Sequence, residues 1–338
     1  MEADILAPHF TDPDKAREFL EAKRWPEGPI CPHCGALGEA YRLQADVENK
    51  KAKTHARKGL YKCGGCREQF TVTVGTVMED SHIPLNKWLF AFHLLCASKK
   101  GMSAHQLHRM LGVTYKSAWF MAHRIRYAMT QEPLSSKLDG IVEIDEAYIG
   151  GKFRVQNRPN MTGPLIKMSA KAMGQDPRTG RNPVKNKEAV VSLVQRGGKV
   201  RSIHMTERVT SENLKGVMDE MLHEDAHVMT DSTTIVNLGS GDRKHDKVNH
   251  SAKEYVRYED GLCITTNTVE GFFATLKRGI NGVYHHVGRQ HLHRYLTEFD
   301  FRYNARQVSD VQRRDLAIKQ VGGKRLTYRD SCAKNGLI

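Results

Sequence analysis

Four cysteines in two close pairs constrain the fold of this chain more than any other feature. The pairs are Cys31 with Cys34 and Cys63 with Cys66, each spaced C-x-x-C. Two such pairs supply four thiolates to one tetrahedral Zn²⁺, and four protein ligands make a structural site because no position stays open for substrate. The spacing predicts a zinc ribbon over residues 29–78, with His33 as a fallback ligand. Two redox pairs, or buried thiols, are the alternatives.

The balance of charges favours an acidic partner. Lys and Arg number 52 against 38 Asp and Glu, which leaves a net charge of +14. An excess of this size favours nucleic acid over an anionic membrane. The longest apolar run, residues 88–97, is half of the roughly 20 residues that a spanning helix needs. The first ten residues lack the basic and apolar regions of a signal peptide. We therefore expect a cytoplasmic, nucleoid-associated protein with no membrane partner.

Residues 82–132 have the pattern of a helical DNA-binding region. Ser103 and Thr114 are candidate N-caps of two helices, and residues 111–113 form a turn between them. Apolar residues share one side of the second helix, which leaves these residues to face outward and contact DNA: Tyr115, Lys116, Ser117, Arg124 and Arg126. The pattern predicts a helix-turn-helix whose second helix enters a major groove. The alternative, an ordinary helical hairpin in a core, is commoner.

Three carboxylates are candidates for a catalytic metal site. Asp145 lies inside a strongly apolar predicted strand, where burial of an aspartate is costly unless a partner compensates it. Asp231 follows a short predicted strand, and Glu270 opens a predicted helix. Ligands that offer only oxygen suit Mg²⁺ or Mn²⁺, and two such ions assist phosphodiester cleavage. Glu143 and Glu146 flank Asp145, and we expect strand alternation to send both to the opposite face.

Each acid also has a structural interpretation. The alternatives are that Asp145 pairs with a basic residue or faces solvent and that Asp231 caps a helix or a turn. Asn267 followed by Glu270 is a capping-box pattern. Lys277 favours the catalytic interpretation, because it lies two helical turns after Glu270 on the same face, where we expect it to hold a phosphate near the metals. Arg278 beside it is a further candidate contact to DNA.

The order of elements beyond residue 138 predicts a mixed α/β fold. Two strands joined by Gly197 and Gly198 precede the first helix, unlike the regular alternation of a doubly wound sheet, so the sheet should be mixed. The predicted helices cover 12–24, 211–223, 268–280 and 290–305, and the predicted strands cover 70–74, 141–148, 188–195, 199–205, 227–230 and 248–250. The basic stretch 152–187 is typical of a long loop or insertion.

Several stretches resemble a known protein family. They are FTVTVGTVMEDSHIPLNKW, LGVTYKSAWFMAHRIRYAM, VEIDEAYIGGK, MTDSTT and the long block TNTVEGFFATLKRGINGVYHHVGRQHLHRYLTEFDFRYNAR. With the paired cysteines, they make the chain similar to bacterial insertion-sequence transposases of the DDE type, in the zinc-ribbon group with an ISXO-like integrase domain. The resemblance covers most of the chain, from about residue 20 to residue 306.

This resemblance implies an RNase H-like fold in which Asp145, Asp231 and Glu270 hold Mg²⁺ or Mn²⁺. Some members of the group place Asn where others use Glu, so Asn267 is the alternative third ligand. The implied reaction is cleavage at the 3′ ends of the element, followed by attack of the freed hydroxyl on target DNA. The ribbon and the helix-turn-helix then bind the terminal inverted repeats, and joining two ends requires a homodimer or larger assembly.

The resemblance also implies a division of the chain. The expected segments are a helical segment at 1–28, the ribbon at 29–78, the helix-turn-helix at 82–132, the RNase H-like domain at 138–310 with its insertion 152–187, and a basic tail at 311–338. Two other functions are compatible with the residues. One is a DNA-binding regulator without catalysis, and the other is a metal-dependent nuclease or resolvase that cuts without joining.

Overall fold

The computed structural model describes residues 6–43, 58–130, 137–150, 187–207, 209–231 and 243–332. The chain forms two compact units, one made of Met1–Gln131 and Ala305–Ile338 and the other of Glu132–Asn304. Apart from Lys187, the predicted basic insertion 152–187 lies outside the described residues. Within the described ranges, no helix combines the length and apolar character needed to span a membrane.

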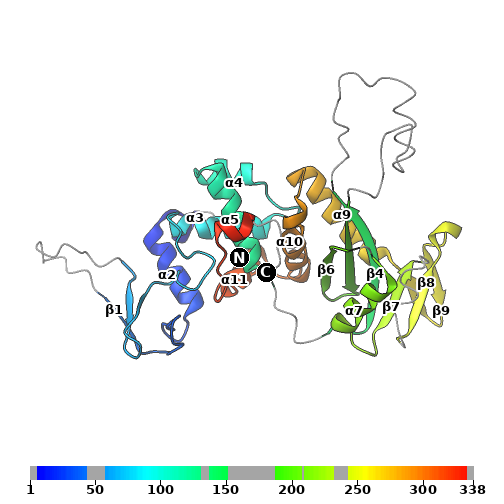
Figure 1. Cartoon of the computed structure of the whole chain (residues 1–338), viewed down its shortest axis with the longest axis horizontal. Helices are drawn as coiled ribbons and strands as arrows, with labels where there is room; N and C mark the ends of the chain where they lie inside the picture. The colour runs from blue at the N-terminus through cyan, green and yellow to red at the C-terminus, as the bar shows by residue number, and fades with distance from the viewer. Residues whose placement is uncertain are drawn as a thin grey trace, which may run out of the picture. The chain divides into compact units, whose positions relative to one another are not determined.

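The first unit joins both ends of the chain around a helical core (Figure 1). Its helices are α1 (Pro8–Thr11), α2 (Pro13–Arg24), α3 (Leu85–Ala97), α4 (Ala104–Leu111), α5 (Tyr115–Ala128), α11 (Asp310–Lys319) and α12 (Tyr328–Cys332). A small antiparallel sheet contains β1 (Ala40–Arg42), β2 (Tyr61–Cys63) and β3 (Gln69–Phe70). Helix α11 packs against α2 and α3, so the predicted basic tail 311–338 contributes helices to this core.

Local capping explains where several of these helices begin. Asp12 accepts a hydrogen bond from the backbone N–H of Asp14 (2.7 Å), which starts α2 at the predicted position. Ser103 and Thr114 cap α4 and α5 in the same way, and Gly112 ends α4 in the left-handed region with φ 57°. The predicted helix pair is therefore confirmed, although α4 extends through Leu111, which the prediction placed in the turn.

The predicted strand over 70–74 is wrong beyond Phe70. The chain turns there, because the backbone N–H of Val74 donates to the carbonyl oxygen of Thr71 (3.1 Å). The hydroxyl of Thr76 donates to the carbonyl oxygen of Thr73 (2.6 Å). Threonine hydroxyls that bond to nearby backbone compete with a strand ladder, and here they prevail over the alternating pattern.

The second unit is built on a mixed sheet of five strands in the order β6-β5-β4-β7-β8 (Figure 1). The sheet strands are β4 (Ile141–Ile149), β5 (Glu188–Gln195), β6 (Val200–Met205), β7 (His227–Asp231) and β8 (His245–Val248). Strands β4, β5 and β6 are antiparallel neighbours, whereas β4, β7 and β8 run parallel. The predicted mixed sheet is confirmed. The hairpin of β9 (Val256–Glu259) and β10 (Leu262–Thr265) was not predicted: β9 is largely exposed, and β10 has only four residues.

Helices cover both faces of this sheet. Helix α7 (Ser211–Met221) packs with Val142 and Ile144 of β4. Helices α9 (Asn267–Gly279) and α10 (Leu292–Asn304) pack with Ala147 and Ile149. Short turns η1 (His250–Ala252), η2 (Ile280–Tyr284) and η3 (Arg289–His291) complete the unit. Because side chains alternate along a strand, the odd-numbered residues of β4 face α9.

Asp300 gives this unit a pH-dependent contribution to stability. It accepts hydrogen bonds from the backbone N–H and the hydroxyl of Ser202 in β6, both at 2.7 Å. Burial between α10 and β6 raises the pKa of Asp300 to about 7, from the ordinary value of 3.8. Between these values the folded chain holds a proton that the unfolded chain releases, so the free energy of unfolding falls as the pH rises from about 4 to 7.

We therefore expect Asp300→Asn to remove this part of the pH dependence. In thermal unfolding from pH 5 to pH 8, the wild type should lose stability relative to the variant as the pH rises, and the difference should level off above pH 7. A difference in Tm that stays constant over this range would contradict the assignment to Asp300.

Candidate active site and zinc centre

Two of the candidate acids lie side by side on neighbouring parallel strands. The register pairs Glu143 of β4 with Met229 of β7, and two residues further along the strands stand Asp145 and Asp231. Both aspartates therefore point to the same face of the sheet, the one that α9 covers. Asp231 is the last residue of β7, so this pair lies where the strand ends.

The third acid reaches this face from the first turn of α9. Glu270 accepts a hydrogen bond from the hydroxyl of Thr266 (3.2 Å), and its Oε1 lies 3.6 Å from Nε2 of His250. Its side chain is 44% exposed, so it remains accessible to solvent. The capping-box interpretation of Asn267 and Glu270 is wrong, because Thr266 is the N-cap and makes no side-chain capping bond.

Asp231 and Glu270 lie close enough to Asp145 for their charges to affect its ionisation. Burial, together with the charges of Asp231 and Glu270, raises the pKa of Asp145 to about 6, while a hydrogen bond from the backbone N–H of Glu146 acts in the opposite direction. Burial also raises the pKa of Glu146, with Asp231 adding to the effect. Repulsion among like charges disfavours the ionised forms, and a divalent cation would relieve it.

The carboxylates are less tightly gathered than the cysteines. Among the residues that the structure describes, only the cysteines place their ligand atoms all within 4.8 Å of one another. Asn267 is exposed, and its backbone N–H donates to Thr265 Oγ1 (3.2 Å). Lys277 is also exposed, with Nζ 5.7 Å from the ring centroid of Phe273, and Arg278 donates to the carbonyl oxygen of Ala274 (3.0 Å). Their predicted roles stay predictions.

The expectation for Glu143 is wrong. Alternation has a period of two, so Glu143 lies on the same face as Asp145 and points toward α9. Its side chain is 0% exposed, and it accepts hydrogen bonds from α9 and from Arg196. Sequence reasoning missed Arg196, which follows β5 and whose partners are distant in the chain. A correct count along β4 would have pointed to Glu143.

The ribbon cysteines meet at one point. Sγ of Cys31 lies 3.6 Å from Sγ of Cys66, and Cys34 and Cys63 have the same separation. Four sulfurs about 2.3 Å from a tetrahedral ion are about 3.8 Å apart, so these distances suit Zn²⁺. All four ligands are protein thiols, and the cluster therefore fits a structural zinc.

The two sites lie in regions that match known families. Residues 137–304 match the ISXO2-like transposase domain, and residues 11–69 match the transposase zinc-ribbon domain. The chain belongs to the transposase family that has the ISXO2-like transposase domain. An uncharacterized protein in the transposable element ISH50 of Halobacterium salinarum is 25% identical over 302 residues, which cover 87% of this chain and 91% of that relative. No solved structure matches the chain.

Two residues predicted to face DNA are buried in this transposase-family chain. Arg124 is 5% exposed and Arg126 is 2% exposed, so the prediction that they face outward is wrong. The guanidinium of Arg124 lies over the rings of Trp88 (5.3 Å) and Phe120 (5.2 Å) and donates to the carbonyl oxygen of Glu79. Burial lowers its pKa to about 10.

The reason for this error lies in the packing of α5. The helix contacts α3, α4, α11 and α12, so it buries more than the single apolar side that the sequence shows. Its first turn remains accessible. Tyr115 is 45% exposed and stacks on His105, and Nζ of the exposed Lys116 lies 4.5 Å from the ring of Tyr328. Ser117 donates its backbone N–H to Thr114 (3.2 Å).

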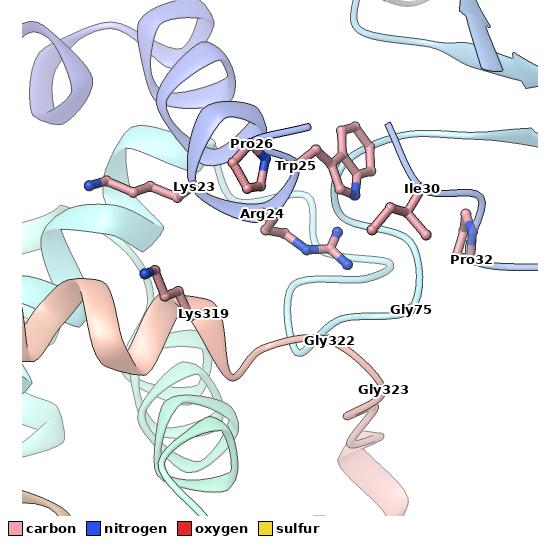
Figure 2. Close-up of a pocket in the computed structure, with 10 residues that line it drawn as sticks. All are labelled: Lys23, Arg24, Trp25, Pro26, Ile30, Pro32, Gly75, Lys319, Gly322 and Gly323. Carbon is pink, nitrogen blue, oxygen red and sulfur yellow. The ribbon is translucent and has the colours of Figure 1, made fainter. Parts of the chain in front are cut away.

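The first unit of the transposase-family chain also contains a basic pocket of about 570 Å³ (Figure 2). The lining residues are Lys23, Arg24, Trp25, Pro26, Ile30, Pro32, Gly75, Lys319, Gly322 and Gly323. Arg24 donates to the carbonyl oxygen of Val72, and Lys23 lies 2.7 Å from Asp315, so both cations already have protein partners. None of the three acids lines this pocket, which is therefore separate from the candidate active site.

Proposed function

We propose that this chain is a DNA transposase that cleaves the 3′ ends of its element and joins them to target DNA. The observation that supports the proposal is that Asp145 and Asp231 lie on neighbouring parallel strands and point to the face that α9 covers, that Glu270 lies in the first turn of α9, and that all three fall inside the transposase domain match. An RNase H-like core accounts for this sheet, with acids on its first strand, on a parallel neighbour and on a later helix.

The three carboxylates would hold Mg²⁺ or Mn²⁺, because all their donor atoms are oxygen. Such ions, when bound, activate an attacking oxygen and stabilise the leaving oxygen of a phosphodiester. The chain's own groups orient this site: Thr266 directs the carboxylate of Glu270 by a hydrogen bond of 3.2 Å. Lys277, exposed on the same helix, would bind a phosphate, and Asn267 is the alternative third ligand.

Recognition of the element ends is assigned to the first unit. The net charge of +14 favours DNA, and the zinc ribbon and the α4–α5 pair would bind the inverted repeats as a helix-turn-helix region. Tyr115, Lys116 and Ser117 at the start of α5 are the proposed contacts, with Arg278 beside the active site. Two ends must be joined at once, so a homodimer or larger assembly would act.

A strand-transfer assay tests the proposal. A labelled duplex that carries the element end is incubated with the full chain, a supercoiled plasmid and Mg²⁺, and the products are resolved on denaturing and native gels. We expect a nick at the 3′ end of the element, followed by a labelled end joined to the plasmid, and EDTA should abolish both products. Cleavage without joining would indicate a nuclease, and binding without either product would indicate a regulator.

A further inference from the structure

Glu143 is a buried carboxylate whose oxygens are all engaged by protein donors. Its Oε2 accepts hydrogen bonds from the backbone N–H groups of Thr268 (2.7 Å) and Val269 (3.0 Å). Its Oε1 accepts from the hydroxyl of Thr268 (2.9 Å) and from Nε of Arg196 (2.7 Å). With four donors and 0% exposure, Glu143 has no lone pair facing solvent and is not itself available as a metal ligand.

These bonds cap the helix that carries the third acid. The first N–H groups of a helix have no partner within it, and negative charge stabilises that end. Thr266, the N-cap of α9, makes no side-chain capping bond, so Glu143 supplies the acceptor from strand β4. Glu143 stands two residues from Asp145, and the capped N–H groups stand within two residues of Glu270. The cap therefore ties the positions of two of the acids together.

Arg196 extends the link to the segment that leads into α9. Its Nη1 donates to the carbonyl oxygen of Cys263 (2.6 Å), and its Nη2 donates to that of Thr265 (3.0 Å). Both acceptors belong to β10, which ends just before α9. The backbone N–H of Arg196 donates to the carbonyl oxygen of Ile141 in β4 (2.9 Å). The side chain of Arg196 thus links β10 to Glu143, and its backbone adds a bond to β4.

We propose that Glu143 and Arg196 are positioning residues that set Glu270 against Asp145 and Asp231, so that the three acids bind a divalent cation. The inference rests on the proposed function, because it takes these acids as the ligands. A buried ion pair seldom adds much net stability over apolar residues of the same volume. Glu143 and Arg196 bond to the backbone of α9 and of β4, two of the three elements that carry the acids, and so determine the placement of these two elements relative to each other.

The first test is Glu143→Gln in the full chain. Glutamine keeps the shape of the side chain but loses its negative charge. Its NH₂ group replaces one of the two carboxylate oxygens, so the two donors that bonded to that oxygen lose their acceptor. We expect the affinity for Mn²⁺, measured by electron paramagnetic resonance without DNA, to fall by about 10–100-fold. Hydrogen exchange at the amides of Thr268 and Val269 should become faster. Arg196→Lys, which keeps the charge but loses the planar fork, should weaken Mn²⁺ binding as well.

Glu298→Gln provides the matched control. Glu298 is also 0% exposed and pairs with an arginine, Arg302, and it accepts a hydrogen bond from the hydroxyl of Tyr284 (2.7 Å). It lies on α10, which carries none of the three acids. We expect this variant to lose thermal stability while its affinity for Mn²⁺ and its amide exchange in α9 match those of the wild type.

Two results would overturn the inference. One is unchanged Mn²⁺ affinity and unchanged amide exchange in both Glu143→Gln and Arg196→Lys. The other is an equal loss of Mn²⁺ affinity in Glu298→Gln, which would reduce Glu143 to a general contribution to stability. Failure of the proposed function is a separate outcome, in which the wild type binds no Mn²⁺. Hydrogen exchange at the amides of Thr268 and Val269 would then still decide whether Glu143 holds α9 in place.

Discussion

Asp145→Asn should lower the rate of strand transfer by at least about 1,000-fold, because loss of a metal ligand removes several kcal/mol of transition-state stabilisation. Binding of the element end should stay within about twofold, since phosphate contacts dominate affinity for DNA. The variant should be as thermally stable as the wild type or more so, because burial, together with the charges of Asp231 and Glu270, already disfavours the ionised carboxylate. Single-turnover strand transfer, filter binding and thermal unfolding measure the three quantities.

Glu259→Gln is the control for removal of one negative charge. Glu259 is an exposed residue of β9 in the same unit, where it pairs with Arg257 at 3.2 Å. Its substitution should leave strand transfer near the wild-type rate. Full turnover by Asp145→Asn would remove this aspartate from the mechanism, and equal losses in both variants would indicate a general effect of charge.

Loss of zinc should unfold the ribbon and weaken binding to the element end at least about tenfold, because an ordered surface presents the phosphate contacts. Structural zinc supplies about 10–16 kcal/mol in zinc-finger peptides, as much as the whole net stability of a typical domain. Cys63→Ser removes a ligand that is 0% exposed and lies 3.6 Å from Cys34. We expect the zinc content to fall from one ion per chain to nearly none.

Cys263→Ser is the matched control for this experiment. Cys263 is a partly exposed thiol of β10, and it lies outside the ribbon. Its substitution should leave both the zinc content and the affinity for DNA unchanged. Limited proteolysis should cut Cys63→Ser within residues 29–78 and spare the second unit. A zinc-free ribbon that resists protease and binds DNA normally would contradict a structural role for the ion.

Short-range interactions made much of this fold predictable. The caps Ser103 and Thr114 mark the starts of α4 and α5, because a side-chain oxygen meets an N–H only three residues away. Strands β4 and β5 could be predicted from their apolar patterns, because each pattern is complete within the eight or nine residues of its strand. The prediction of a strand over 70–74 was wrong because of another short-range interaction. The hydroxyl of Thr76 bonds to the carbonyl oxygen of Thr73 and stabilises a turn, although the residues alternate as in a strand.

The sequence by itself determined the identity of the candidate ligands, because the donor atoms of a side chain and the spacing of paired cysteines are both fixed by the sequence. An aspartate inside an apolar strand is conspicuous in the same way. Only the tertiary structure decided which charged groups are buried and what they contact. Glu143 meets Thr268 across 125 residues, and Arg124 lies among aromatic rings of helices α3 and α5. Such contacts depend on which elements pack together, and the spacing of residues along the chain does not predict that packing.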